Sequence, residues 1–148
     1  MKRESIIQKF SICAALIFVV LASGCVSIGP TVKTYSGDKL QKSEVAIIKG
    51  WWSFYLLAWE CIEIYQIDGR TVEATKVEVL PGPHFLVIRN YSTSLVAPIG
   101  APPKLAQVDY NFEAGHEYKI KYWFKSILIK GVKIIDVTTG AIIYSQPW

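Results

Sequence analysis

The chain has 148 residues, a formal net charge of +4 and 51% hydrophobic residues. This length suits one domain with a short extension. A nucleic-acid-binding protein needs a strong and clustered positive charge, so this charge balance argues against nucleic acid as a partner.

The first 25 residues carry the pattern of an export signal. Lys2, Arg3 and Lys9 precede an apolar run from Phe10 to Ala22, and small residues then lead to Cys25. A basic start, a short apolar core and a small-residue cleavage region are the three parts of a secretory signal. The 13-residue apolar run is shorter than the roughly 18 to 20 residues that span a bilayer. We therefore predict that residues 1–24 are removed.

The sequence LASGC, Leu21 to Cys25, resembles the lipobox of bacterial lipoproteins, with Ala22 where Leu is commonest. The resemblance implies that Cys25 becomes the N-terminus and carries an N-acyl diacylglyceryl lipid, with no other cofactor. Val26 in place of Asp resembles the default that sends such proteins of Gram-negative cells to the outer membrane, facing the periplasm. In a host with a single membrane, the anchor would display the domain on its outer side. The alternatives are an ordinary signal peptide or a short membrane helix with a chance cysteine.

Removal of residues 1–24 leaves 124 residues, and the net charge falls to +2 because three cations and one acidic residue are lost. Two cysteines then remain, Cys25 and Cys61. A lipidated Cys25 leaves Cys61 without a partner, so we expect no disulfide within the domain.

The segment that follows the lipobox is polar. Residues 26–44 contain Gly29, Pro30 and Gly37 as breakers, so we predict a lipidated, flexible tether over residues 25–44. Fully stretched, the chain from Cys25 to Val45 would reach about 65 Å.

From residue 45 to residue 148 the chain alternates apolar and polar side chains with a period of two. The clearest cases are Val108–Phe112 and Tyr118–Lys125, which the turn Glu113–Glu117 joins into a predicted antiparallel hairpin. Seven to nine short strands with frequent turns predict an all-β fold, an antiparallel β-sandwich. The other expected strands are Val45–Lys49, Cys61–Ile67, Lys76–Leu80, Phe85–Asn90, Ile127–Ile129, Val132–Val137 and Ala141–Ser145.

The run from Ile67 to Tyr91 resembles a PEGA-type repeat, with a DG turn, a strand, a PGxH turn and an apolar strand. The later AGHEY, Ala114 to Tyr118, resembles a motif of small bacterial lipoproteins that carry such a module. The chain departs from the repeat at Arg70 and Thr71, where a Thr-Pro pair is common, and in its long link from Ser92 to Lys104. The resemblance implies a transthyretin-like or immunoglobulin-like β-sandwich and no enzyme activity.

The turns contain the residues that their geometry requires. We expect positive φ at Gly69 and Gly82, and Pro81 presets its corner. His84 and His116 each end a glycine-containing turn, where we expect the imidazole to bond turn carbonyls. A metal site would need further ligands, and none stands at a recognised spacing.

The most unusual stretch is aromatic. Trp51, Trp52, Phe54, Tyr55 and Trp59 fall within nine positions. Such a run fits a core strand buried on both faces. It also fits an exposed surface that contacts the headgroup region of a membrane, a partner protein or, at lower rank, a glycan.

Neither a nucleophile motif nor a metal motif is present, so we predict a protein that is not an enzyme. The sequence favours a non-catalytic binding or structural module, held at the membrane by its lipid, that presents an aromatic patch to the membrane or to an envelope protein. The alternative is an envelope enzyme or enzyme inhibitor with a site near His84 and His116. The sequence does not indicate the oligomeric state.

Overall fold

A computed structural model describes residues 30–55, 58–94, 102–125 and 130–148, with side chains left out at 54–55, 58–59 and 92–94. The predicted signal peptide, Cys25 and the strand expected at Ile127–Ile129 lie outside these residues. Within them the protein is all-β, and it holds no helix long and apolar enough to cross a membrane.

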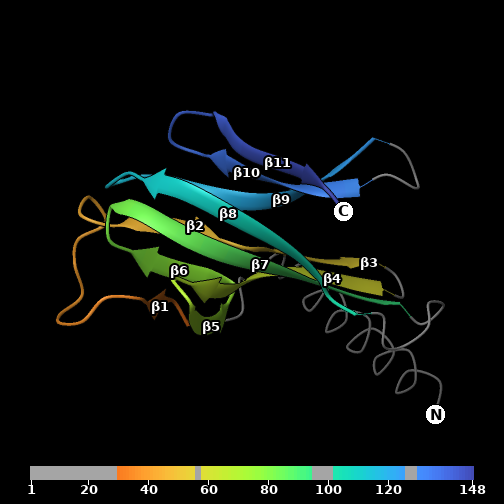
Figure 1. Cartoon of the computed structure of the whole chain (residues 1–148), viewed down its shortest axis with the longest axis horizontal. Helices are drawn as coiled ribbons and strands as arrows, with labels where there is room; N and C mark the ends of the chain where they lie inside the picture. The colour runs from red at the N-terminus through yellow and green to blue at the C-terminus, as the bar shows by residue number, and fades with distance from the viewer. Residues whose placement is uncertain (1–29, 56–57, 95–101, 126–129) are drawn as a thin grey trace, which may run out of the picture.

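The described residues form eleven strands in two sheets (Figure 1). The first sheet has the order β1-β6-β2-β9-β10-β11; the second has the order β3-β4-β7-β8, with β5 paired to β4. The pairs β1–β6 and β2–β9 are parallel and the others are antiparallel. The strands are β1 Val32–Lys33, β2 Ala46–Lys49, β3 Trp51–Tyr55, β4 Ala58–Ile67, β5 Arg70–Ala74, β6 Lys76–Val79, β7 Gly82–Ser94, β8 Lys104–Phe112, β9 Glu117–Phe124, β10 Lys130–Asp136 and β11 Ile142–Pro147.

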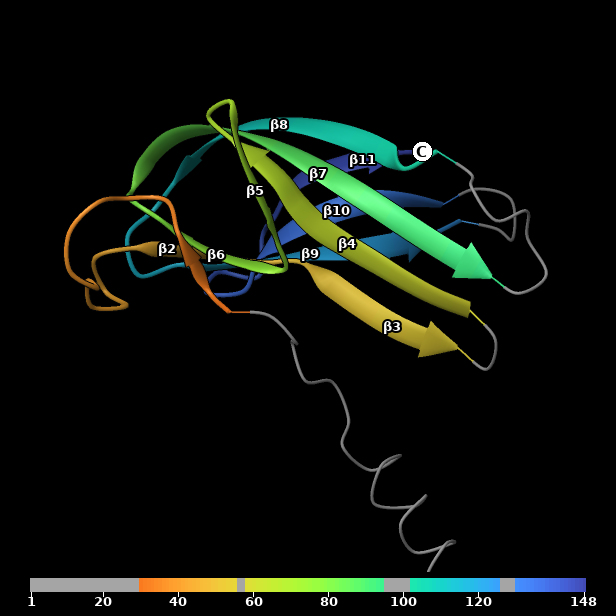
Figure 2. The same ribbon diagram turned by 90° about the horizontal axis from the view of Figure 1, so that it is seen from below.

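The two sheets enclose one hydrophobic core. In Figure 2, β4 and β7 of the second sheet cross in front of β9 and β10 of the first. The predicted alternation decides which side chains enter the core: Val108 and Phe112 of β8 face Tyr118 and Ile120 of β9, and all four are at most 3% exposed. Burial of such apolar surface is the main stabilising term of a chain without a disulfide.

The predicted β8–β9 hairpin is wrong. β8 pairs with β7 in the second sheet, whereas β9 pairs with β10 and β2 in the first. The turn between them therefore crosses from one sheet to the other, and Phe112 and Tyr118 meet edge to face across the core at 4.8 Å. An alternating pattern specifies the buried face of each strand but not its neighbour in the sheet.

The predicted tether is also shorter than expected. Val32 and Lys33 form β1, which pairs in parallel with β6 at the edge of the first sheet. The Tyr35 hydroxyl donates to the buried Glu78 carboxylate over 3.3 Å, and the Leu40 N–H donates to the Tyr35 hydroxyl over 3.3 Å. The folded domain thus begins near Val32 rather than at Val45, because β1 satisfies an edge of the sheet that would otherwise be open.

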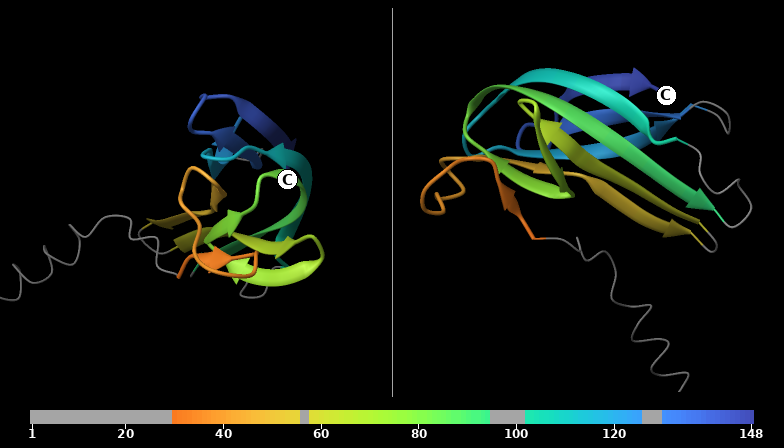
Figure 3. Two further views of the ribbon diagram at one scale, coloured as in Figure 1. Left: turned by 90° about the vertical axis from the view of Figure 1, so that its left-hand side faces the viewer. Right: turned by 60° about the horizontal axis from the view of Figure 1, so that its bottom comes forward.

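The chain changes sheets at Gly50, between β2 and β3. A Cβ at this position would lie 2.1 Å from the carbonyl oxygen of Ile62, so only glycine fits there without a shift of the backbone. Most of the expected strands coincide with β2, β4, β6, β7, β10 and β11, whereas the short strand β5 was not predicted. Figure 3 shows the two sheets from two further directions.

Candidate functional site

The aromatic run separates into an inner and an outer part. Neighbouring residues of a strand point to opposite faces of the sheet, so the side chains of Trp51 and Trp52 lie on opposite faces. Trp51 lies against the core and meets Tyr122 edge to face at 4.9 Å, whereas Trp52 is 41% exposed. The backbones of Phe54 and Trp59 pair in the β3–β4 hairpin. The side chains of Phe54, Tyr55 and Trp59 lie outside the described part of the structure.

On the outer face of the second sheet, Trp52 lies in a row with residues of β4 and β7. It is paired in register with Cys61, and Cys61 is paired with Tyr91, which is 36% exposed. Directly opposed residues of adjacent strands have side chains on the same face. A tryptophan and a tyrosine therefore flank the thiol on one exposed surface.

The next row of this face is organised by Arg89. Its guanidinium carbon lies 4.0 Å from the ring centre of Tyr65 and 4.7 Å from that of Tyr91. The same side chain pairs with Glu63 at 2.5 Å and with Glu73 at 2.9 Å. Burial alone would lower the pKa of Arg89, but the bonds to these two carboxylates outweigh it and raise the pKa. The cation is thus fixed between two rings and two carboxylates.

We call Trp52, Tyr65, Arg89 and Tyr91 the aromatic face. Leu105 of β8, paired in register with Arg89, extends it and is 53% exposed. Burial, with the neighbouring Glu63 second, raises the pKa of the Cys61 thiol, so this sulfur stays protonated and is a poor nucleophile. Burial and then Glu63 likewise raise the pKa of Tyr91. Both groups are neutral near pH 7. The aromatic face therefore presents uncharged aromatic rings around one cation, Arg89, which is already paired with two carboxylates.

The PGPH turn places His84 against Asp68. The imidazole Nδ1 lies 2.6 Å from Asp68 Oδ2, and Nε2 lies 2.8 Å from the carbonyl oxygen of Leu80. Both partners only accept hydrogen bonds, so both bonds form together when each ring nitrogen carries a proton. Burial would raise the pKa of Asp68, but the bonds from His84 and from the Phe85 N–H lower it. Gly69 and Gly82 beside this pair have φ of 77° and 134°, while Pro81 is exposed in the corner.

The AGH turn builds a second pair of the same kind. His116 Nδ1 lies 2.8 Å from Oδ2 of Asp136, a carboxylate only 4% exposed, and Nε2 lies 3.5 Å from Oε2 of Glu113. Asp136 also accepts from the Thr138 N–H at 2.8 Å and the Thr139 hydroxyl at 2.8 Å. Burial would raise the pKa of Asp136, but these bonds lower it, with His116 the largest contributor among them.

The turn between β6 and β7, which precedes His84, and the turn between β8 and β9, which contains His116, lie at the same end of the molecule, on the left in Figure 1. A chain of rings joins them: His84 and Phe112 are 6.2 Å apart, Phe112 and Tyr118 4.8 Å, and Tyr118 and His116 6.1 Å between ring centres. An acid or base catalyst needs a ring nitrogen that can reach a substrate. Here the ring nitrogens already have acceptors, and no group of three metal-ligating side chains occurs among the described residues.

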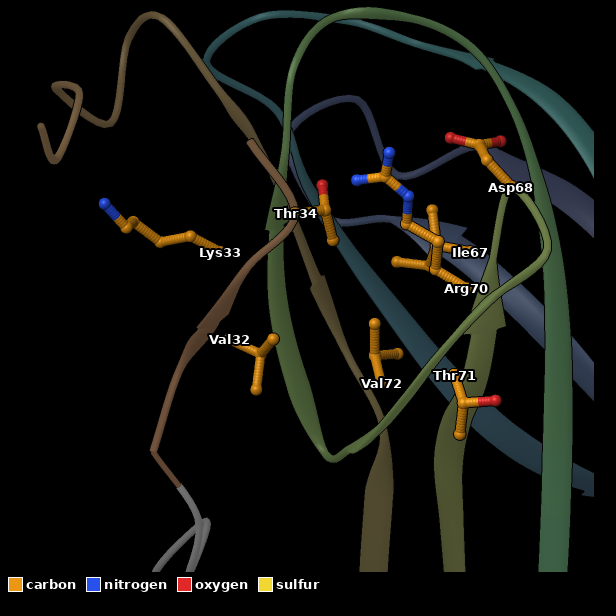
Figure 4. A pocket seen from close by; sticks show the side chains of 8 residues that line it. All are labelled: Val32, Lys33, Thr34, Ile67, Asp68, Arg70, Thr71 and Val72. Atoms are coloured by element: carbon orange, nitrogen blue, oxygen red, sulfur yellow. The ribbon is translucent and has the colours of Figure 1, made fainter. Parts of the chain in front are cut away.

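A hollow of about 550 Å³ opens beside β1 and β5 (Figure 4). Arg70 reaches across the opening toward Thr34, whereas Lys33 points away from it. The Asp68 carboxylate at its rim is already bound by His84. The Thr34 hydroxyl is likewise bonded to the Glu78 carbonyl, which leaves Arg70 as the charged side chain that faces the opening, without the convergent polar groups of a ligand site.

The chain was compared with protein-family models, curated proteins and solved structures, and no significant match appeared in any of the three. The class of the molecule therefore follows from its own geometry: an all-β domain of two sheets whose second sheet exposes an aromatic face.

The aromatic run in the sequence contains Trp52 but none of its neighbours on this face. Tyr65, Arg89 and Tyr91 lie on β4 and β7, far from the aromatic run in the sequence, and they meet only through the pairing of those strands. The usable signal was the pair Arg89 and Tyr91, which occupy alternate positions of β7 directly after its apolar stretch Phe85–Ile88.

Proposed function

We propose that the protein is a non-catalytic binding module of the cell envelope, held at a membrane by a lipid on Cys25, and that its aromatic face contacts an envelope protein. For the fold we propose a β-sandwich of the transthyretin or immunoglobulin kind, which the two mostly antiparallel sheets around one core support. The outer membrane, facing the periplasm, is the location that the lipobox and Val26 favour.

The observation that carries the binding role is the composition and rigidity of the aromatic face. Tryptophan, tyrosine and arginine are the residue types that dominate binding hot spots. Arg89 is held by Glu63 and Glu73 and packed between Tyr65 and Tyr91, so little side-chain freedom remains to be lost when a partner binds. A stiff, exposed surface of this kind favours recognition of a protein.

Catalysis near His84 and His116 is the weaker alternative. Both ring nitrogens of His84 are bonded, one to Asp68 and the other to the Leu80 carbonyl. The two ring nitrogens of His116 lie against Asp136 and Glu113. Cys61, with its raised pKa, is no better a candidate for a nucleophile. These contacts support a structural role for both histidines.

The binding role can be tested with a double variant, Trp52→Ala with Tyr91→Ala. We expect capture of the partner by chemical cross-linking in the native envelope to fall at least tenfold, while the melting temperature changes by less than about 3 °C. Ile142→Ala is the matched control, because Ile142 is 60% exposed on the first sheet. Equal capture by the double variant and the wild type would refute the aromatic face as the binding surface.

The anchor is tested separately by mass spectrometry of protein from the native host. We expect an N-terminus at Cys25 that carries diacylglyceryl and acyl groups. A mature protein that retains Met1 and an unmodified thiol at Cys25 would refute the lipoprotein assignment.

A further inference from the structure

The outer face of the first sheet carries lysines in register with one another. Lys76 of β6 is paired with Lys49 of β2, which is paired with Lys119 of β9. One row further, Lys121 of β9 is paired with Lys133 of β10. Directly opposed residues share a face of the sheet, so all five ammonium groups lie on one side. We call them the lysine face.

Two carboxylates share this face: Glu117, and the buried Glu78, which pairs with Lys39 at 3.9 Å. Lys49 pairs with Glu117 at 2.7 Å. Across the described ranges, the other four lysines make no ion pair. Like charges placed directly opposite on a sheet are destabilising, so the free protein bears a cost that an anionic surface would remove.

The opposite face of the molecule differs in charge. On the outer side of the second sheet, Glu63 and Glu73 hold Arg89, and the exposed Asp109 lies in β8. The positive charge of the domain is therefore concentrated on one of its two broad faces. A charge separated in this way orients a protein at a charged surface.

The place of β1 connects the lysine face with the membrane. Val32 stands seven positions after Cys25, so the connection spans at most about 25 Å. β1 is the edge strand of the first sheet, next to β6 with its Lys76. An anchor at Cys25 would hold this sheet, rather than the second, close to the bilayer.

We propose that the lysine face docks on the anionic phospholipid headgroups of the bilayer that holds the anchor, so that the aromatic face points away from that bilayer. This inference rests on the proposed lipid at Cys25. Basic groups near an anionic membrane surface are attracted within about one Debye length, which suits a domain on so short a connection.

The test uses the lipidated protein purified from the native envelope and reconstituted in vesicles of phosphatidylcholine alone or with one quarter phosphatidylglycerol. Exposed lysines are modified with a bulky amine reagent and quantified by mass spectrometry. We expect Lys121 and Lys133 to react at least threefold more slowly on the anionic vesicles, and this protection to disappear in 0.5 M salt. Lys104, exposed on β8 of the second sheet, is the internal control and should react equally on both.

The matched variants are Lys121→Glu with Lys133→Glu, and Lys104→Glu as the control. The double variant should lose the protection of Lys119, and the control should keep it, with the melting temperature of each measured to verify folding. Protein that floats with both kinds of vesicle but shows no added protection on the anionic ones refutes the docking and leaves the anchor standing. Protein that floats with neither refutes the anchor and the docking with it. Protection by duplex DNA but not by anionic vesicles would also refute it, in favour of another polyanion.

Discussion

The outer faces of the two sheets differ in how their charged side chains are arranged. Both sheets turn apolar side chains inward by the same alternation, but their outer faces differ. The second sheet pairs its cation, Arg89, with two carboxylates, Glu63 and Glu73. The first sheet places Lys121 opposite Lys133 with no carboxylate between them. A stiff face whose cation is already paired is suited to recognition of a protein, whereas a face of positive charge is suited to an anionic surface outside the protein.

The largest effect is expected from a glycine on the lysine-bearing sheet. A Cβ at Gly131 would lie 2.3 Å from the Gln146 carbonyl oxygen and 2.6 Å from the Trp123 ring. Gly131→Ala should therefore lower the free energy of unfolding by about 3 kcal/mol, measured by urea denaturation, because the β10–β11 pairing must shift. Gly140→Ala, with open space around its Cβ position but φ of 79°, should cost only about 1 kcal/mol. Equal losses of stability in the two variants would show that Gln146 and Trp123 can move aside for the added methyl group.

The pair Asp136 and His116 lies apart from both the aromatic face and the lysine face, and its stability should depend on pH. Asp136 is buried and holds His116 and two threonines, and its pKa is lowered by those bonds. A carboxylate with a lowered pKa in the folded state stabilises above its unfolded pKa of about 3.9 and loses that contribution as the pH falls through the folded value. Asp136→Asn should therefore cost about 2 kcal/mol at pH 7 and progressively less below pH 4.

Unfolding at pH 7, 4 and 2.5 checks this dependence. Asp68→Asn is the comparison, because the pKa of Asp68 is also lowered but this carboxylate is more exposed than Asp136. A cost of Asp136→Asn that stays constant from pH 7 to pH 2.5 would contradict the assignment.

The stability of the protein should depend on both the charge and the shape of the Arg89 side chain in the aromatic face. Arg89→Met removes the partner of Glu63, whose side chain is 14% exposed, and should lower the free energy of unfolding by about 1.5 kcal/mol. Arg89→Lys keeps the charge but loses the planar fork and its stacking, and it should cost about half as much. Thermal unfolding of both variants separates charge from geometry. A lysine variant as stable as the wild type would mean that the contacts with Tyr65 and Tyr91 contribute nothing.

The smallest effect has the opposite sign. Lys121→Gln removes one member of a pair of like charges and should raise the free energy of unfolding by about 0.3 kcal/mol at low salt. The gain should vanish in 0.5 M salt, where exposed charges are screened. Lys104→Gln is the control and should change nothing. A loss of stability in Lys121→Gln would show that Lys121 makes a favourable interaction in the free protein, which would contradict the expected repulsion.

The sequence alone was enough to predict an all-β domain, most of its strands and the buried side of two of them, β8 and β9. These follow from the local chemistry of alternating side chains and turn residues. The resemblance of LASGC to a lipobox also comes from the sequence, because its residues are contiguous.

Only the tertiary structure decided which strands are neighbours, and every surface depends on that choice. It separated β8 from β9, turned Trp51 inward and Trp52 outward, and docked β1 at the edge of the first sheet. It also collected lysines spread from residue 49 to residue 133 onto one face, a feature invisible in a modest net charge. The physical reason is that alternation is a local property of each strand, whereas pairing depends on contacts between segments far apart in the chain.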